Sequence, residues 1–70
     1  MRMSGTVKFY NPRKGFGVIR PQDGSEDVFV HATAVEFAGM RTLNEGDKVS
    51  FVLEDDSTRR GKQAGEIEWA

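Results

Sequence analysis

Five short segments, separated by turn-forming residues, constrain the fold of this 70-residue chain more than any other feature. Valine, phenylalanine and isoleucine recur in the segments, whereas glycine, proline, asparagine and aspartate recur between them. Residues 33–36 could form a single helical turn, but nothing in the chain has the length of an independent helix. The predicted strands are TVKFY (6–10), GFGVI (15–19), DVFVH (27–31), VSFVL (49–53) and the weaker QAGEIEW (63–69).

A chain of this length forms one domain at most, residues 1–70, and buries only about 60% of the surface that its unfolded form exposes. Five strands in so small a domain must close on themselves to cover both a core and their own edges. We therefore expect an all-β fold, a five-stranded antiparallel Greek-key barrel of the OB type.

The composition excludes several classes of site. The chain has no cysteine and one histidine, which rules out disulfides and thiolate ligands and argues against zinc. No nucleophile is paired with an acid or base, so we expect neither an enzyme nor a cofactor. The first residues, MRMSGTVKFYN, lack the apolar region expected of a signal peptide, and no apolar run approaches the roughly 20 residues that span a membrane. We expect a soluble cytoplasmic protein.

The distribution of charge says more than the net charge of −1. Residues 1–20 contain no acid, residues 21–58 hold most of the acids, and RRGK (59–62) is basic again. An ordinary mixed surface and a local positive face on an acidic body both fit this pattern. The basic residues of the first segment are Arg2, Lys8, Arg13, Lys14 and Arg20.

Alternation along the second and third predicted strands separates two faces. One face would carry the aliphatic residues Ile19, Val28 and Val30, and we expect Phe51 and Ile67 to join them in the core. The other face would carry Phe16, Val18, Arg20, Phe29 and His31. A core would not hold an arginine beside a histidine without partners. We therefore predict that the second face is exposed, although burial is the usual fate of phenylalanine.

Exposed aromatic rings interleaved with cations are what single-stranded nucleic acid requires. Bases stack on the rings, and cations follow the backbone phosphates. Gly15 and Gly17 would then leave the Phe16 ring clear for a base. Lys14 could complete a turn or contact a phosphate, and His31 could be a surface residue, a partner of Asp27 or a stacking ring.

Two motifs resemble those of a known family. KGFGVI (14–19) is similar to the first ribonucleoprotein motif of the bacterial cold-shock proteins, and DVFVH (27–31) is similar to the second. VKFYN (7–11), GMRTLNEGDKVSF (39–51) and RGKQA (60–64) match the family in order and spacing, so the resemblance covers essentially the whole chain.

The resemblance implies a five-stranded antiparallel Greek-key barrel that binds single-stranded RNA and DNA and melts RNA structure without ATP. Such an RNA chaperone would affect translation or transcription termination. The matching positions imply that the contacts are Lys8, Phe9, Lys14, Phe16, Asp27, Phe29, His31 and Arg60. Simple alternation groups Phe9 with core Val7, so a kink or bulge must bring Phe9 onto the binding face.

The chain departs from the family pattern at four positions. Phe9 stands where tryptophan is usual, and phenylalanine is replaced at Val18, Ala32 and Met40. Val18 and Met40 can still offer apolar contact. We expect weaker binding than in typical members, with phosphate attraction compensating through Arg13, Arg20, Arg59 and Lys62, and therefore a steeper dependence on salt.

An alternative function is a protein-interaction barrel with a weakened nucleic-acid face. The loop AVEFAGM (34–40), with Phe37 and Met40 as exposed apolar candidates, favours it. We expect a monomer, with strand exchange as a route to a dimer. Trp69 would cap the barrel or cover a strand edge.

Overall fold

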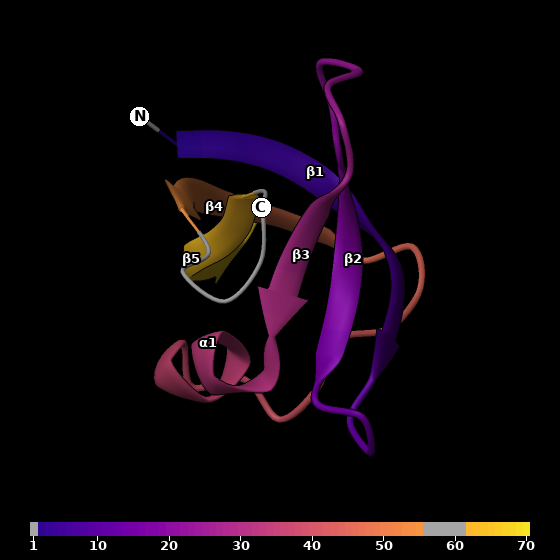
Figure 1. The fold of residues 1–70 in the computed structure, drawn as a ribbon, viewed down its shortest axis with the longest axis vertical. Coiled ribbons are helices and arrows are strands. Elements are labelled where there is room, and N and C mark those ends of the chain that lie inside the picture. The colour runs from indigo at the N-terminus through magenta and orange to yellow at the C-terminus, as the bar shows by residue number, and fades with distance from the viewer. Residues whose placement is uncertain (1, 56–61) are drawn as a thin grey trace.

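A closed barrel forms from the residues that the computed structural model describes, 2–55 and 62–70 (Figure 1). This confirms the expected five-stranded barrel. The helical turn expected at 33–36 lies within a short helix, α1, and no helix in the described residues is long and apolar enough to cross a membrane. The elements are β1 (Arg2–Asn11), β2 (Phe16–Pro21), β3 (Val28–His31), α1 (Ala32–Phe37), β4 (Lys48–Asp55) and β5 (Lys62–Trp69).

The strands follow the order β1-β2-β3-β5-β4 around the barrel. Four neighbouring pairs are antiparallel, but β3 and β5 are parallel and meet at Phe29 and Gln63. This parallel pair is compatible with the expected Greek-key barrel of the OB type. A closed ring with an odd number of strands cannot alternate direction at every step, so one pair must run parallel.

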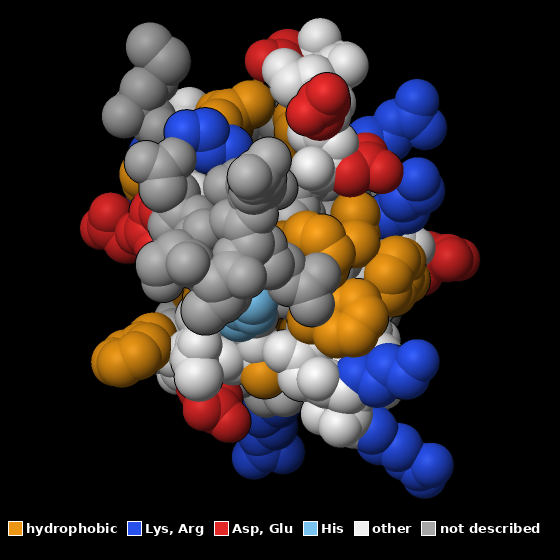
Figure 2. Space-filling model, viewed as in Figure 1, with side chains coloured by type: hydrophobic (Ala, Val, Ile, Leu, Met, Phe, Trp, Pro, Cys, Tyr) orange, Lys and Arg blue, Asp and Glu red, His pale blue; other side chains and the backbone are white. Residues whose placement is uncertain are grey.

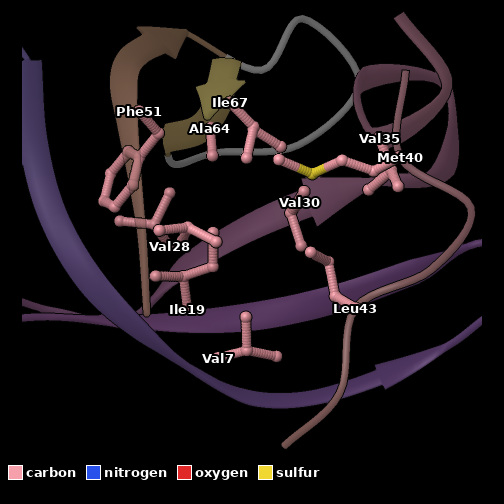
Figure 3. Packing of buried hydrophobic residues seen from close by; sticks show 11 residues of the cluster. Val7, Ile19, Val28, Val30, Val35, Met40, Leu43, Phe51, Ala64 and Ile67 are labelled. Carbon is pink, nitrogen blue, oxygen red and sulfur yellow. The ribbon is translucent and has the colours of Figure 1, made fainter. Parts of the chain in front are cut away.

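The core fills the barrel and extends beneath α1 (Figure 3). Every residue expected in it is buried, which confirms the inward face of β2 and β3. The buried hydrophobic residues are Val7, Ile19, Val28, Val30, Val35, Met40, Leu43, Val49, Phe51, Ala64 and Ile67.

Met40 corrects an expectation, because the sequence predicts an exposed apolar contact at this position. It is only 9% exposed and packs in the core cluster, beside Val35 in Figure 3. The chain turns back after α1, and the Met40 N–H donates to the Val35 carbonyl at 3.1 Å. That hydrogen bond holds the segment against α1, so the thioether closes one end of the barrel.

Trp69 lies at the end of β5, opposite Val49 in the β4–β5 ladder. Its side chain is 55% exposed. Leu53, at the end of β4, is also partly exposed, although it continues the face of Val49 and Phe51. Both residues therefore mark places where the barrel ends and its inner face meets solvent.

Gly17 is required for the close approach of β1 and β2, which differs from the role that we expected. It is buried, and a Cβ atom there would lie 2.7 Å from both the Phe9 carbonyl oxygen and the Tyr10 Cδ1 atom. The missing side chain therefore makes room for β1. It does not clear space beside the Phe16 ring, which points to the other face.

Gly17→Ala should destabilise the fold by about 1–3 kcal/mol, because the added methyl group must displace backbone atoms of β1. Urea denaturation measures the change. Alanine is otherwise favoured over glycine in a strand interior by about 0.5–1 kcal/mol. Unchanged or increased stability would therefore contradict the close approach of the two strands.

Candidate nucleic-acid interface

Three phenylalanine rings lie in contact on the outer surface of β1, β2 and β3. The Phe9 and Phe16 centroids are 6.0 Å apart with an interplanar angle of 80°, and the Phe16 and Phe29 centroids are 5.7 Å apart at 47°. Figure 2 shows the hydrophobic patch over these strands, with basic side chains beside it. We call the surface formed by Phe9, Phe16, Val18, Phe29 and His31 the aromatic face.

A β-bulge in β1 places Phe9 on this face. Val7 is paired with Ile19, but the next pair in the register is Phe9 with Val18, so Lys8 is the extra residue. Because the insertion reverses the alternation, Val7 points into the core while Phe9 is 43% exposed. The bulge that the sequence required near Phe9 is confirmed.

The register of β2 and β3 aligns the other members of the aromatic face. Val18 is opposite Phe9 on one side and opposite Phe29 on the other, and Phe16 is opposite His31. These β2 and β3 residues are half-buried, whereas their inward neighbours are buried. The rings therefore stand in adjacent cross-strand rows, with a smaller aliphatic side chain between Phe9 and Phe29.

The turn between β1 and β2 displays two cations beside the rings. The Asn11 Oδ1 atom accepts hydrogen bonds from the backbone N–H groups of Arg13 at 3.0 Å and Lys14 at 3.2 Å. Gly15 closes the turn with a φ of 80°, and its carbonyl accepts a 2.9 Å hydrogen bond from the Ala32 N–H. Asn11 thus positions Arg13 and Lys14. From the sequence alone, Asn11 was recognised only as a turn-forming residue.

Lys8 is tethered beside the rings by an ion pair. Its Nζ atom lies 3.0 Å from the Asp27 Oδ2 atom, and both side chains are substantially exposed. Asp27 precedes β3 directly, so the pair joins the bulge in β1 to the start of the third strand. Asp27 partly neutralises the charge of Lys8. Arg13, Lys14 and the exposed Arg20 are the further positive groups near the aromatic face.

A hollow of about 550 Å³ adjoins Phe29 at one end of the barrel. Sequence reasoning associated Asp27, Phe29 and Lys62 with the site, but not the other lining residues, which come from strand ends and from the loop between β2 and β3. The hollow is lined by Met3, Pro21, Ser25, Glu26, Asp27, Val28, Phe29, Leu53 and Lys62.

Among residues 2–55 and 62–70, two groups have shifted pKa values. Burial raises the pKa of the Tyr10 phenol, and the nearby Glu36 carboxylate adds to that effect. Hydrogen bonds from the Ser25 hydroxyl and backbone N–H lower the pKa of the exposed Asp23 carboxyl. The Asp23 hydrogen bonds with Ser25 lie in the turn between β2 and β3.

The structure does not bring every predicted contact to the aromatic face. Met40 is in the core, and Arg60 and Arg59 lie outside the described residues. Ala32, which stands where the family pattern has phenylalanine, begins α1. The described residues contain no group of three or more side chains arranged to hold a metal ion.

Comparison with known proteins places the chain among cold-shock proteins. Residues 3–69 match the "'Cold-shock' DNA-binding domain" family. The chain is 57% identical over 63 residues to cold shock protein CspA of Rhizobium meliloti, covering 90% of each. It is 50% identical over 66 residues to cold shock-like protein CspG of Escherichia coli K12, covering 94% of this chain and 91% of the relative. Over 63 residues it is 52% identical to cold shock protein CapA of Pseudomonas fragi, covering 90% and 95%.

Lys8→Gln should change the free energy of unfolding by less than about 1 kcal/mol, because an exposed ion pair is screened by water. Asp27→Asn, the matched change of the partner, should have an equally small effect. Urea denaturation of both single variants and the double variant measures the coupling. A coupling of several kcal/mol would show that the pair is structural, and Lys8 would then be a poor candidate for a phosphate contact.

Proposed function

The chain belongs to the cold-shock protein family, and on that premise we propose that it is a sequence-tolerant binder of single-stranded RNA and DNA that acts as an ATP-independent RNA chaperone. Proteins of this family bind single-stranded nucleic acids and are not enzymes. The observation that carries the proposal is the set of three contacting rings on an outward face, with basic side chains around it.

The rings supply affinity without selecting a sequence. Every base has an aromatic face, and stacking contributes about 1–3 kcal/mol per base. Phe9 and Phe29 are separated across the strands by Val18, while Phe16 contacts both rings. This spread over three strands suits a chain of consecutive bases, each splayed onto its own part of the face.

The cations supply the phosphate contacts. Lys8 lies on the bulge, Arg13 and Lys14 on the β1–β2 turn, and Arg20 near the end of β2. Attraction must be local, because the whole chain has a net charge of −1. A phosphate beside Lys8 would compete with Asp27, whereas Arg13 and Lys14 are oriented through backbone hydrogen bonds to Asn11 that leave their side chains exposed.

Chaperone activity follows from preference for unpaired bases. In a duplex the bases stack on one another, so the rings can accept them only after the strands separate. A ligand that binds one state shifts the equilibrium toward it by mass action, and no ATP is needed. We expect this activity in the cytoplasm, where it would affect translation or transcription termination. The protein would act as a single-domain monomer, and strand exchange would give a dimer.

The affinity should lie below that of relatives that carry the complete family pattern of rings. Val18 offers a small aliphatic surface between Phe9 and Phe29, and Ala32 offers less still. Met40 is enclosed in the core and adds nothing to the face in this conformation. Replacement of two or three stacking rings would cost several kcal/mol if nothing compensates.

Phe16→Ala and Phe29→Ala should each reduce binding of a fluorescently labelled heptameric oligo-dT and of its RNA counterpart by about tenfold or more. Each variant removes a ring that bases stack upon. Anisotropy titration measures the affinity, and circular dichroism checks that the fold persists. Trp69→Ala, an exposed aromatic at the end of β5, is the matched control and should bind normally. Equal binding by all four proteins would exclude the aromatic face as the binding site.

Binding should weaken steeply as salt increases. If Lys8, Arg13, Lys14 and Arg20 each neutralise a phosphate, the plot of log affinity against log salt should have a slope of about −3 for single strands. Arg13→Gln should reduce the magnitude of this slope by about 0.7. A slope near zero would show that cations do not contribute, and the proposed compensation for missing rings would be wrong.

A further inference from the structure

Phe37 presents a large aromatic ring to solvent at a place that the aromatic face does not use. It is the last residue of α1 and is 93% exposed, whereas Val35 in the same helix is buried. Figure 2 shows a hydrophobic protrusion over α1, separate from the patch over β2 and β3. So exposed a ring contributes almost nothing to the core. We therefore ask which partner molecule its neighbouring residues would favour.

The ring borders two hollows. One, of about 350 Å³, lies between α1, β4 and β5, and we call it the Phe37 groove. The other, of about 270 Å³, is lined by Thr33, Glu36 and Phe37. The Phe37 groove is lined by Ala34, Phe37, Ala38, Glu54, Gly65 and Glu66.

Apart from Phe37, the lining of the Phe37 groove consists of small residues and acidic residues. Ala34, Ala38 and Gly65 are too small to fill the groove, and the Glu54 carboxylate lies over Gly65, where a Cβ atom would collide with it. The groove is therefore lined by one aromatic residue, three small residues and two acidic residues, Glu54 and Glu66. With Glu36 in the adjoining hollow, acidic groups lie on both sides of Phe37.

The acidic residues of the groove make few polar contacts with the other residues that the structure describes. Within the described part of the chain, the Glu54 carboxylate accepts a 3.5 Å hydrogen bond from the Gln63 Nε2 atom. The Glu66 backbone carbonyl accepts a hydrogen bond from Arg2. Among residues 2–55 and 62–70, the ion pairs are Arg2 with Glu68 and Lys8 with Asp27. Glu36, Glu54 and Glu66 are therefore not neutralised within that part of the chain.

We propose that the Phe37 groove binds an arginine side chain from a basic segment of a partner protein. A guanidinium group can stack on the Phe37 ring and donate paired hydrogen bonds to a carboxylate. The aliphatic part of the arginine side chain would pack on Ala34, Ala38 and Gly65. Lysine offers a more strongly hydrated point charge without the planar surface, so it should bind less well.

The charges argue against nucleic acid as the occupant. A base stacked on Phe37 would bring its phosphates toward Glu36, Glu54 and Glu66, and like charges repel. The aromatic face has the opposite arrangement, with cations around the rings. Because the Phe37 groove shares no residue with the aromatic face, one molecule could hold an oligonucleotide and a basic peptide together. This inference goes beyond the proposed function and does not depend on it.

The test uses an end-capped synthetic peptide of alternating arginine and glycine, with lysine–glycine and citrulline–glycine peptides as controls. Titration into the ¹⁵N-labelled full chain should shift the amide signals of Ala34, Phe37, Ala38 and Gly65, with the arginine peptide binding most tightly. Phe37→Ala should weaken peptide binding by about two- to fivefold, the contribution expected of an exposed cation–π contact. Glu54→Gln and Glu66→Gln should weaken it similarly, while Trp69→Ala leaves it unchanged.

A double comparison separates this site from the aromatic face. Phe37→Ala should retain oligo-dT binding, and Phe16→Ala should retain peptide binding. Unchanged peptide affinity in the Phe37 and glutamate variants would overturn the proposal, because the peptide would then bind acidic surface elsewhere. Equal affinity for the citrulline peptide would also overturn it. Loss of oligo-dT binding in Phe37→Ala would assign the ring to nucleic acid instead.

Discussion

The extra residue at Lys8 is the feature on which the outer surface of the barrel depends. With strict alternation, Val7 and Phe9 would point the same way, and one of them would have to leave the core or crowd it. The bulge lets Val7 pack against the core while Phe9 joins Phe16 outside, with ring centroids 6.0 Å apart. The close approach of β1 at Gly17 supports the same arrangement, because β2 offers no side chain there. One local irregularity thus makes a hydrophobic core and an aromatic surface from adjacent residues of one strand.

Local hydrogen bonds, more than an overall excess of positive charge, position the basic residues beside the aromatic face. Asn11 fixes the turn that displays Arg13 and Lys14, and Asp27 holds Lys8 near Phe9. Most acids lie in the second half of the chain, and three of them surround Phe37. The aromatic face and the exposed Phe37 ring therefore lie in opposite electrostatic surroundings. This contrast favours phosphates at one region and cations at the other, although the rings themselves are chemically alike.

Much of this arrangement could be predicted from the sequence, because strand residues alternate between two faces with a period of two. An irregularity such as the bulge is indicated where two residues that must face opposite ways fall on the same face of this pattern. Ile19, Val28 and Val30 were correctly assigned to the core, and the need for a bulge before Phe9 followed from Val7. The parallel β3–β5 pair was not specified from the sequence, although an odd number of strands in a closed ring requires one. Met40 could not be placed, because the segment after α1 has no period, and the local turn at Gly39 that directs Met40 toward the core was not recognised. The groove beside Phe37 was equally invisible, since its walls come from α1, β4 and β5.

The central claim is that the bulge at Lys8 creates a working platform of three rings. The most direct test is to record intermolecular nuclear Overhauser effects between the phenylalanine ring protons and the base protons of a bound heptameric oligonucleotide. The account predicts contacts from Phe9, Phe16 and Phe29 to different bases, and none from Phe51, which is buried in the core. Contacts to Phe16 and Phe29 without Phe9 would show that the bulge does not serve binding. Absence of contacts to all three rings in a saturated complex would contradict the account.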